Sequence, residues 1–247
     1  MFNSLSLGIS LLLACLPFAG CAEDSDKKRD RDSDKKRRLV DNMRIHLFIE
    51  KLKIVRVSKN LDAFWTCFIS NSNSAFPDGS VLSEKTPAGF AAYAWDKWRW
   101  QHADFWFMED AADVMDHNKY GTDGMPEFIG DGDGGLDTDV TSDQKKAISW
   151  EIAIPKEGAT SNLNTLTRKR GKFPIIWTKG LQSSGEWDGD SPWGGDGGHI
   201  LWSDGTKEYY NNTSGDDEKG IFEDENGNRT KDINRAIPDD WEIIKPE

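Results

Sequence analysis

The sequence predicts an α+β fold in which an N-terminal helix, or broken helix, packs on a C-terminal antiparallel β-meander. Three observations lead to this prediction. Apolar residues recur at helical spacing before residue 70, β-favouring runs occur after residue 148, and an Asp-Gly pair joins the last two of these runs. Helices followed by strands, without alternation between the two, are typical of helices packed on an antiparallel sheet.

The first predicted helix covers about residues 41–70. A polar cluster at 71–74, followed by Pro77, ends it. Spacing of i, i+3, i+4, i+7 and i+8 places five apolar residues of its second half on one face. These residues are Leu61, Phe64, Trp65, Phe68 and Ile69.

A second helix is predicted to begin at Pro87, with Thr86 as its N-cap. Threonine is a favoured N-cap, and proline is favoured at the first helical position. The strands follow later in the chain. Residues 148–154 alternate between apolar and polar side chains, and residues 173–178 form a short apolar run.

The last two predicted strands form a hairpin around Asp204 and Gly205. Asp-Gly suits a two-residue type I′ turn, because glycine adopts a positive φ without strain. We therefore assign Asp204 and Gly205 a structural role. A two-residue loop would place His199 opposite Tyr210. In that register one face of the hairpin is apolar and the other is more polar, so we expect the hairpin to be half-buried. Its apolar face would then carry Ile200, Trp202 and Tyr209.

Residues 5–18 are a short apolar segment that leads to small residues and Cys21. About 20 apolar residues are needed to span a bilayer, so the segment predicts a secretory signal. Residues 18–21 resemble a bacterial lipobox, which implies cleavage and acylation of the Cys21 thiol. An ordinary cleaved signal and a lipobox ending at Cys15 are the alternatives. Ala22 follows Cys21, and this favours an exported, outer-membrane lipoprotein.

Behind Cys21, residues 22–38 carry eight basic and six acidic residues and almost no apolar surface. The composition predicts a disordered tether, whose residues 35–38 could touch anionic headgroups as an accessory contact. Residues 39–247 are predicted to form a single domain with a net charge of −14, which argues against a nucleic-acid partner. Its lone cysteine, Cys67, is expected to be a buried small apolar residue.

Residues 197–210, a Gly-Gly-His-Ile string followed by Asp-Gly and Tyr, resemble the C-terminal signature of bacterial pilin-like proteins related to type II secretion pseudopilins. Residues 58–61 with Phe76 and Pro77, and the segments 176–181 and 190–194, are similar to other parts of that family. The resemblance covers about residue 58 to the C-terminus. It implies a pilin-like head. The prepilin leader of that family is replaced here by the lipoprotein-like signal.

Four aspartates alternate on a glycine-rich stretch at 131–139. Carboxylate oxygens are the hard ligands that Ca²⁺ prefers, so a calcium site is one interpretation and a solvated acidic loop is the other. The resemblance to secretion pseudopilins, some of which depend on calcium, supports the first, but we expect the solvated loop and no cofactor. The candidate ligands are Asp131, Asp133, Asp137 and Asp139.

Tryptophan occurs 11 times. Trp65 and Trp98 lie on apolar helical faces and are expected in the core. Packing is also the better expectation for four others, which would serve as surface contacts if they are exposed: Trp95, Trp100, Trp187 and Trp193.

The sequence lacks Gly-x-Ser-x-Gly, His-Glu-x-x-His and phosphate-loop motifs. We expect a non-enzymatic envelope lipoprotein with a pseudopilin-like head, which partners the membrane through its anchor and binds envelope or secretion-system proteins. The alternative is a surface lipoprotein that binds or hydrolyses polysaccharide through Trp and Asp residues.

Overall fold

A computed structural model of the chain describes residues 25–107, 126–159 and 162–246. The chain divides into two units, residues 1–50 and residues 51–247. Helix α1 (Ser25–Ser72) contributes residues to both units. Among the described residues, no helix combines the length and the apolar character needed to cross a membrane.

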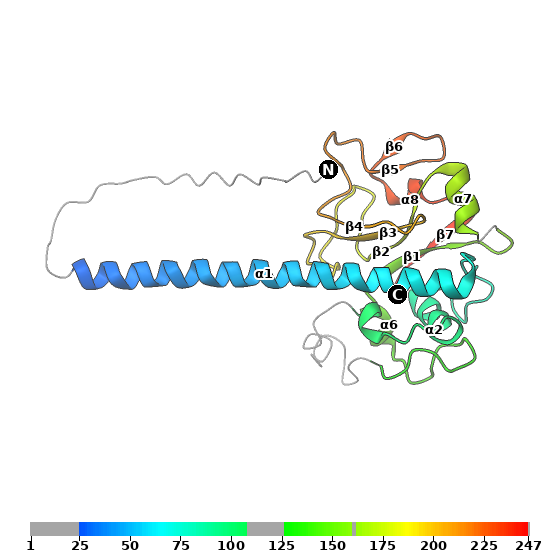
Figure 1. Ribbon diagram of the computed structural model, residues 1–247, viewed down its shortest axis with the longest axis horizontal. Coiled ribbons are helices and arrows are strands. Elements are labelled where there is room, and N and C mark those ends of the chain that lie inside the picture. Colours follow the sequence, from blue (N-terminus) through cyan, green and yellow to red (C-terminus); the bar gives the residue numbers. More distant parts are fainter. Residues whose placement is uncertain (1–24, 108–125, 160–161, 247) are drawn as a thin grey trace. The chain divides into compact units, whose positions relative to one another are not determined.

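The unit 51–247 has the mixed α+β architecture that the sequence predicts (Figure 1). Besides the end of α1, the helices among its described residues are α2 (Pro87–Lys97), α3 (Ala103–Trp106), α6 (Ser142–Ala147), α7 (Leu163–Arg170) and α8 (Ile233–Ala236). Its strands are β1 (Trp150–Pro155), β2 (Pro174–Thr178), β3 (Gly198–Trp202), β4 (Lys207–Tyr210), β5 (Phe222–Glu223), β6 (Arg229–Thr230) and β7 (Trp241–Ile244).

Five strands form one antiparallel sheet in the order β4-β3-β2-β1-β7. Strands β1 to β4 follow one another as the predicted meander. Strand β7, which the sequence analysis did not predict, returns from the end of the chain and pairs with β1, so that Ile152 lies opposite Ile244. Strands β5 and β6 form a separate two-stranded sheet.

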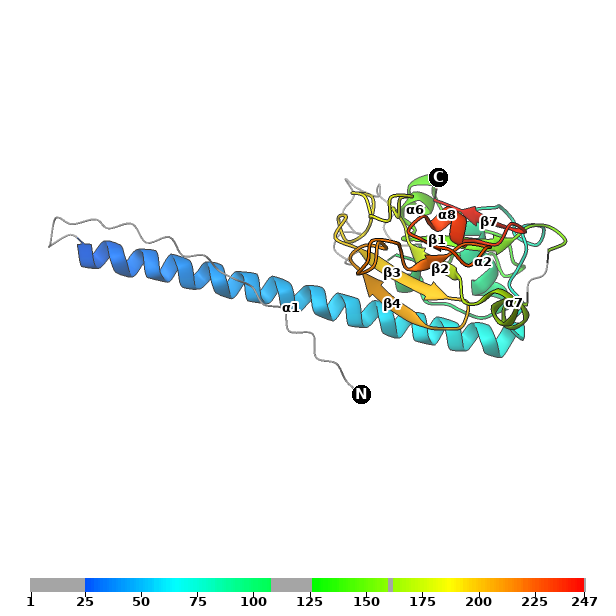
Figure 2. The ribbon, with the colours of Figure 1, turned by 90° about the horizontal axis from the view of Figure 1, so that it is seen from above.

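The C-terminal part of α1 runs along one face of the five-stranded sheet (Figure 2). Phe64 of α1 is fully buried and stacks on Phe105 with ring centroids 4.8 Å apart. Phe105 stacks in turn on Trp150 of β1, at 5.2 Å. This line of rings joins helix to sheet. On the other face, Trp202 of β3 contacts Phe222 of β5 at 5.6 Å.

Helix α2 begins as the sequence predicts. The Thr86 side chain accepts a hydrogen bond from the backbone N–H of Gly89, at 3.2 Å, and Pro87 is the first helical residue. This cap satisfies one of the backbone donors that every helix leaves free at its start. Almost every residue of α2 is buried, which places it inside the core.

Helix α1 begins at Ser25, so the prediction of a disordered tether over 22–38 is wrong from that residue onward. The segment 25–38 contains no glycine or proline and is rich in lysine and arginine, whose helix propensity is high. Extending a helix that already exists also avoids the unfavourable nucleation step. Low apolar content therefore excluded burial here, but it did not exclude a helix.

The hairpin turn has three loop residues, so the prediction of a two-residue type I′ turn is wrong. Trp202 and Thr206 close the loop through a 2.8 Å backbone hydrogen bond, and the N–H of Gly205 donates to the Trp202 carbonyl at 2.9 Å. Gly205 has a φ of 84°, as expected for the left-handed residue that ends such a loop. His199 therefore lies opposite Tyr209 instead of Tyr210.

This one-residue change moves Tyr209 to the other face of the hairpin, because side chains alternate along a strand. The expected set of Ile200, Trp202 and Tyr209 on one face is therefore wrong. All five residues of β3 are buried, so this strand is not half-buried either. Helix α1 covers one of its faces, and Phe222 contacts the other.

Candidate functional site

The hairpin that carries the resemblance to pilin-like proteins contacts α1. A Cβ atom added at Gly205 would lie 2.3 Å from Nε1 of Trp65, so the turn lies directly against that indole. Beside it, Lys207 forms an ion pair with Asp62 of α1. The positive φ predicted at Gly205 is confirmed, and the same glycine also permits this close approach.

Asp204 and Ser203 fix the turn itself. The Asp204 carboxylate accepts hydrogen bonds from the backbone N–H of Thr206 at 2.9 Å and from its hydroxyl at 2.6 Å. The buried Ser203 hydroxyl accepts from the N–H of Phe173 at 3.1 Å. Asp204 thus stabilises the loop locally, whereas Ser203 ties it to the segment that enters β2.

His199 provides a further contact between β3 and α1. Its Nε2 lies 3.2 Å from the carbonyl oxygen of Ile54. Because a carbonyl only accepts, Nε2 carries the hydrogen and Nδ1 is a bare acceptor, which has no hydrogen-bond partner among the described residues. The side chain is fully buried, and this burial lowers the pKa of His199 to about 4. The imidazole is therefore neutral near pH 7.

Two glycines before His199 allow dense packing around the start of β3. A Cβ at Gly198 would lie 2.5 Å from Nε1 of Trp187, and one at Gly197 would lie 2.4 Å from the Tyr210 carbonyl oxygen. Trp187 uses that Nε1 to donate to the Thr178 carbonyl of β2, at 3.0 Å. The Gly-Gly-His string is therefore explained by close contacts within the sheet.

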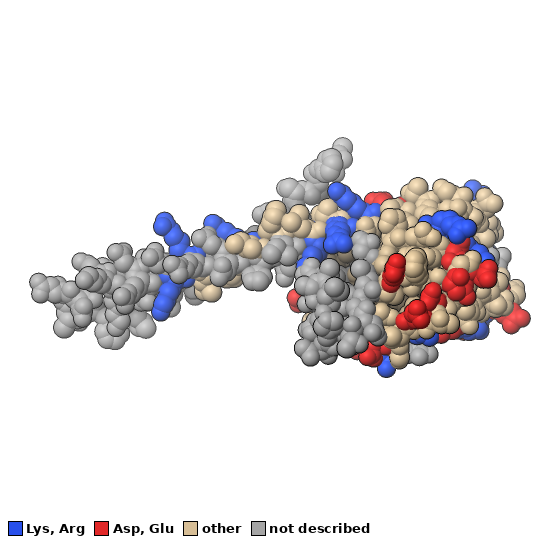
Figure 3. Space-filling model, turned by 90° about the horizontal axis from the view of Figure 1, so that it is seen from below, with Lys and Arg blue, Asp and Glu red and all other residues tan. Residues whose placement is uncertain are grey.

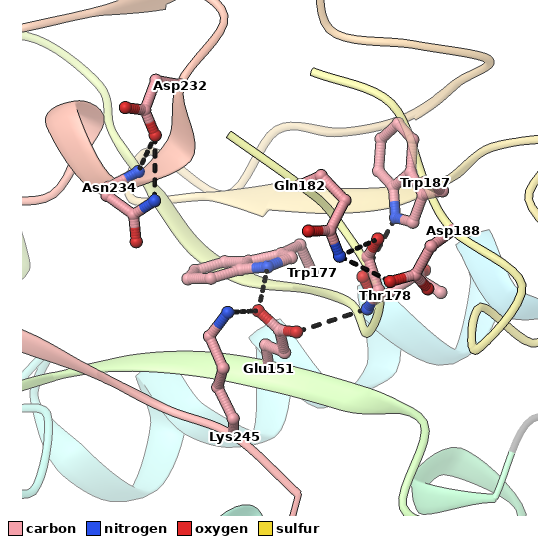
Figure 4. Close-up of polar contacts among 10 residues, drawn as sticks. Glu151, Trp177, Thr178, Gln182, Trp187, Asp188, Asp232, Asn234 and Lys245 are labelled. Atoms are coloured by element: carbon pink, nitrogen blue, oxygen red, sulfur yellow. Dashed lines mark hydrogen bonds and ion pairs between the residues drawn. The ribbon is translucent and has the colours of Figure 1, made fainter. Parts of the chain in front are cut away.

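A buried carboxylate, Glu151 of β1, lies on the face of the sheet away from α1 (Figure 4). One oxygen accepts from Nε1 of Trp177 at 3.0 Å and lies 3.4 Å from Nζ of Lys245. The other oxygen accepts from the backbone N–H of Gly180, at 3.3 Å. These contacts join β1, β2 and the residue that follows β7.

Burial raises the pKa of Glu151, and the neighbouring Lys245 ammonium opposes that rise. The donors that surround the carboxylate come from the protein, so the arrangement is suited to holding strands together. Sequence analysis missed this group. The only charged residue in the run 148–154 lies at its centre, and this was the signal that could have revealed it.

The acidic stretch uses two of its four aspartates in local turns. Asp131 accepts from the backbone N–H groups of Asp133 and Gly135, at 2.8 and 2.9 Å. Asp137 accepts from the N–H of Asp139 at 2.9 Å. The structure does not bring the four carboxylates together: within the described ranges, no group of three or more His, Cys, Asp or Glu side chains could hold a metal ion.

An unpredicted aspartate fastens this loop to α2. Asp96 is buried, and one of its oxygens accepts from the backbone N–H groups of Gly132 and Gly134, at 3.1 and 2.8 Å. The adjacent Lys97 donates to the Asp133 carbonyl at 2.6 Å. The loop thus wraps around a carboxylate supplied by the helix.

All eleven tryptophans lie in the described residues, and none is exposed. Trp98 is in the core, as predicted, and Trp65 is half-buried against it. Of the four possible surface contacts, Trp193 is half-buried and the other three are buried. Flat exposed indoles, which a sugar ring would need for stacking, are therefore not offered by these residues.

The two remaining cysteine predictions have different outcomes. Cys21 lies outside the described residues, so its acylation stays a prediction. Cys67 is only partly buried, and its thiol donates to the Trp98 carbonyl at 3.1 Å. Burial raises the pKa of Cys67, which favours the protonated thiol.

Comparison with protein-family models, curated proteins and solved structures found no match to this chain.

Proposed function

We propose that this chain is a non-enzymatic envelope lipoprotein with a pseudopilin-like head, which binds other components of a secretion or cell-surface apparatus. Three features support the proposal. A long helix packs on an antiparallel meander, the signature-like hairpin contacts that helix, and the sequence carries a lipobox-like junction at Cys21. Acylation of Cys21 would supply the anchor, and the described head would supply the binding surface.

The observation that carries the binding role is the concentration of exposed apolar side chains on α1. Among the described residues, nine large apolar side chains are exposed, and seven of them belong to this one helix. Single exposed apolar residues are normal on a soluble protein, but clustering indicates a surface that another molecule covers. The seven are Leu39, Val40, Met43, Ile45, Phe48, Leu52 and Val55.

Within the unit 51–247, Leu52 and Val55 are the relevant pair. They are 52% and 51% exposed, and helical spacing places them on the side opposite the buried Leu61 and Phe64. The helix thus has one apolar side that aromatic residues of the unit cover and a second apolar side that is exposed. Burying such a side chain fully is worth about 1.5–3 kcal/mol, which makes this second side a favourable contact for a protein partner.

Photo-crosslinking in cells tests the binding role. A benzophenone amino acid replaces Leu52 or Val55 in the full chain, and the matched control carries it at Phe128, which is 54% exposed and lies outside α1. We expect adducts with discrete proteins from positions 52 and 55 and few from position 128. Leu52→Ser with Val55→Ser should remove binding of the partner identified in this way, without lowering the melting temperature.

Absence of protein adducts from both α1 positions would contradict the binding role. Depletion of a soluble polysaccharide by the purified chain, or release of reducing ends from it, would instead favour the polysaccharide alternative. Protein adducts without polysaccharide binding or hydrolysis therefore support the binding role, and the reverse result supports the polysaccharide alternative.

A further inference from the structure

The charges of α1 between residues 35 and 44 are opposite in sign to those of the chain as a whole. This short stretch has five basic residues and one acidic residue, whereas the whole chain has a net charge of −12. Figure 3 shows Lys and Arg side chains along the helix, and both signs of charge on the visible face of the residues beyond it. Lys35, Lys36 and Arg37 are all exposed.

Apolar side chains accompany these charges on one side of the helix. Leu39, Val40 and Met43 are 62%, 45% and 58% exposed. Their spacing of one and four residues keeps them within about 100° of the helix circumference. Lys36 lies one turn before Val40 on that side, and Arg44 lies one turn after it. We call these five residues, together with Lys35 and Arg37, the basic-apolar face.

We propose that the basic-apolar face lies on an anionic phospholipid surface, an inference that adds a second membrane contact to the proposed envelope anchoring. The three apolar side chains enter the boundary between headgroups and acyl chains. The cations at both ends of the apolar patch contact lipid phosphates, while their aliphatic stems follow the apolar side chains. Lipidated proteins gain stable attachment when such a basic patch supplements the acyl anchor.

Charge complementarity and surface chemistry together favour lipid over the acidic head of a second copy. An acidic protein surface would attract the cations, but it would also need an apolar patch for Leu39, Val40 and Met43. Within the described part of 51–247 that lies outside α1, only Val81 and Phe128 are large apolar residues that are exposed. An anionic bilayer supplies the negative charge and the apolar layer side by side.

An environment-sensitive fluorescent amino acid in the full chain tests this contact locally, whatever the apolar leader does. The probe replaces Met43 in one protein and Phe48 in the matched control, because position 48 is 63% exposed but lies on another side of the helix. Vesicles contain either phosphatidylcholine alone or a mixture with phosphatidylglycerol. We expect a blue shift at position 43 with the anionic vesicles only, reversed by about 0.5 M salt because salt screens the attraction.

The basic residues are tested in the same assay. Each cation near an anionic membrane contributes about fivefold to the partition coefficient. Lys35→Gln with Lys36→Gln and Arg37→Gln should therefore raise the lipid concentration for half-maximal shift more than tenfold. The control, Lys169→Gln with Lys219→Gln and Lys231→Gln, removes the same charge from exposed positions elsewhere and should change little.

Three results would overturn the proposal: no shift at position 43, equal shifts at positions 43 and 48, or equal shifts with neutral and anionic vesicles. A shift without vesicles that grows with protein concentration would also overturn it, because a second copy would then cover this face. The crosslinking at positions 52 and 55 involves different residues and no vesicles, so its outcome can fail or succeed separately.

Discussion

Burial sets the protonation state of His199 and so links the stability of the unit 51–247 to pH. The pKa of this imidazole is about 4 in the folded chain, whereas an unperturbed histidine titrates near 6.5. The unfolded chain therefore binds the proton more readily. We expect the free energy of unfolding to fall by about 3 kcal/mol as the pH decreases from about 6.5 to about 4.

Urea unfolding of the wild type and of His199→Gln between pH 7 and pH 4 measures this effect. Carboxylates titrate in the same interval in both proteins, so the difference between the two curves isolates His199. The matched control is His102→Gln, which replaces a histidine at an exposed position outside the core. Parallel curves for wild type and His199→Gln would show that His199 does not titrate as the structure implies.

At Glu151, the hydrogen bonds matter more than the charge. Glu151→Leu removes the acceptor for Trp177 Nε1 and for the Gly180 N–H, at about 1–3 kcal/mol for each donor left unpaired. Glu151→Gln keeps one acceptor oxygen and avoids burying a charge, but its amide nitrogen faces the other donor, so it should cost about 1–3 kcal/mol, roughly half the loss for Glu151→Leu. Urea unfolding at pH 7 compares the two variants.

The raised pKa of Glu151 also sets the direction in which stability changes with pH. The folded chain holds this proton more tightly than the unfolded chain does, so Glu151 favours folding most below its raised pKa and less as the pH rises through it. Glu151→Gln should remove this dependence, and Glu157→Gln on the exposed loop should not. Equal losses for Glu151→Leu and Glu151→Gln at pH 7 would contradict the structural role of its acceptors.

At the scale of elements, the β3–β4 hairpin is held against α1 through its turn. Gly205→Ala combines a strained positive φ with an overlap on Trp65, and we expect it to cost about 1–3 kcal/mol. Gly227 has a φ of 75° but has no atom near its added Cβ, so Gly227→Ala should cost less. Thermal unfolding of both variants gives the difference.

A double-mutant cycle tests the contact itself. Trp65→Ala removes the indole that the new Cβ would meet, so Gly205→Ala should cost less in that background than in the wild type. Additive effects, together with equal costs at Gly205 and Gly227, would show that the turn does not pack on α1. The hairpin would then be free for another contact.

The hairpin also shows how far sequence reasoning reaches. An Asp-Gly pair between two β-favouring runs identified the strands and the positive φ of Gly205, because these depend on local chemistry. The register was wrong because two- and three-residue loops can both end in Gly. The choice is coupled to Ser203, whose hydroxyl accepts from Phe173 about thirty residues away, a tertiary contact that no local pattern reveals.

Other elements were missed for the same physical reason. Strand β7 has four residues, and it becomes a strand by pairing with β1, which lies about ninety residues earlier. The carboxylates of Glu151 and Asp96 are buried because backbone and side-chain donors from distant segments surround them. Helix α2, by contrast, was predictable from its Thr86 cap and Pro87, since both act within a single turn.

For the whole molecule, the distribution of charge and apolar surface follows the two units. The described part of residues 1–50 carries exposed cations and exposed apolar side chains on α1, whereas the unit 51–247 buries nine of the eleven tryptophans around its sheet. This contrast suits a chain in which the segment near the proposed anchor meets other surfaces and the head is a stable folded body. The proposed envelope role assumes attachment of lipid at Cys21.

Mass spectrometry of the mature N-terminus, on protein purified from cell envelopes, tests that attachment most directly. We predict that the first residue is Cys21, with a diacylglycerol on its thiol, and that Cys21→Ser abolishes the modification. The mature chain should then partition with the membrane fraction until the lipid is removed. An unacylated N-terminus beyond Cys21 would contradict the proposal that this chain is an envelope lipoprotein.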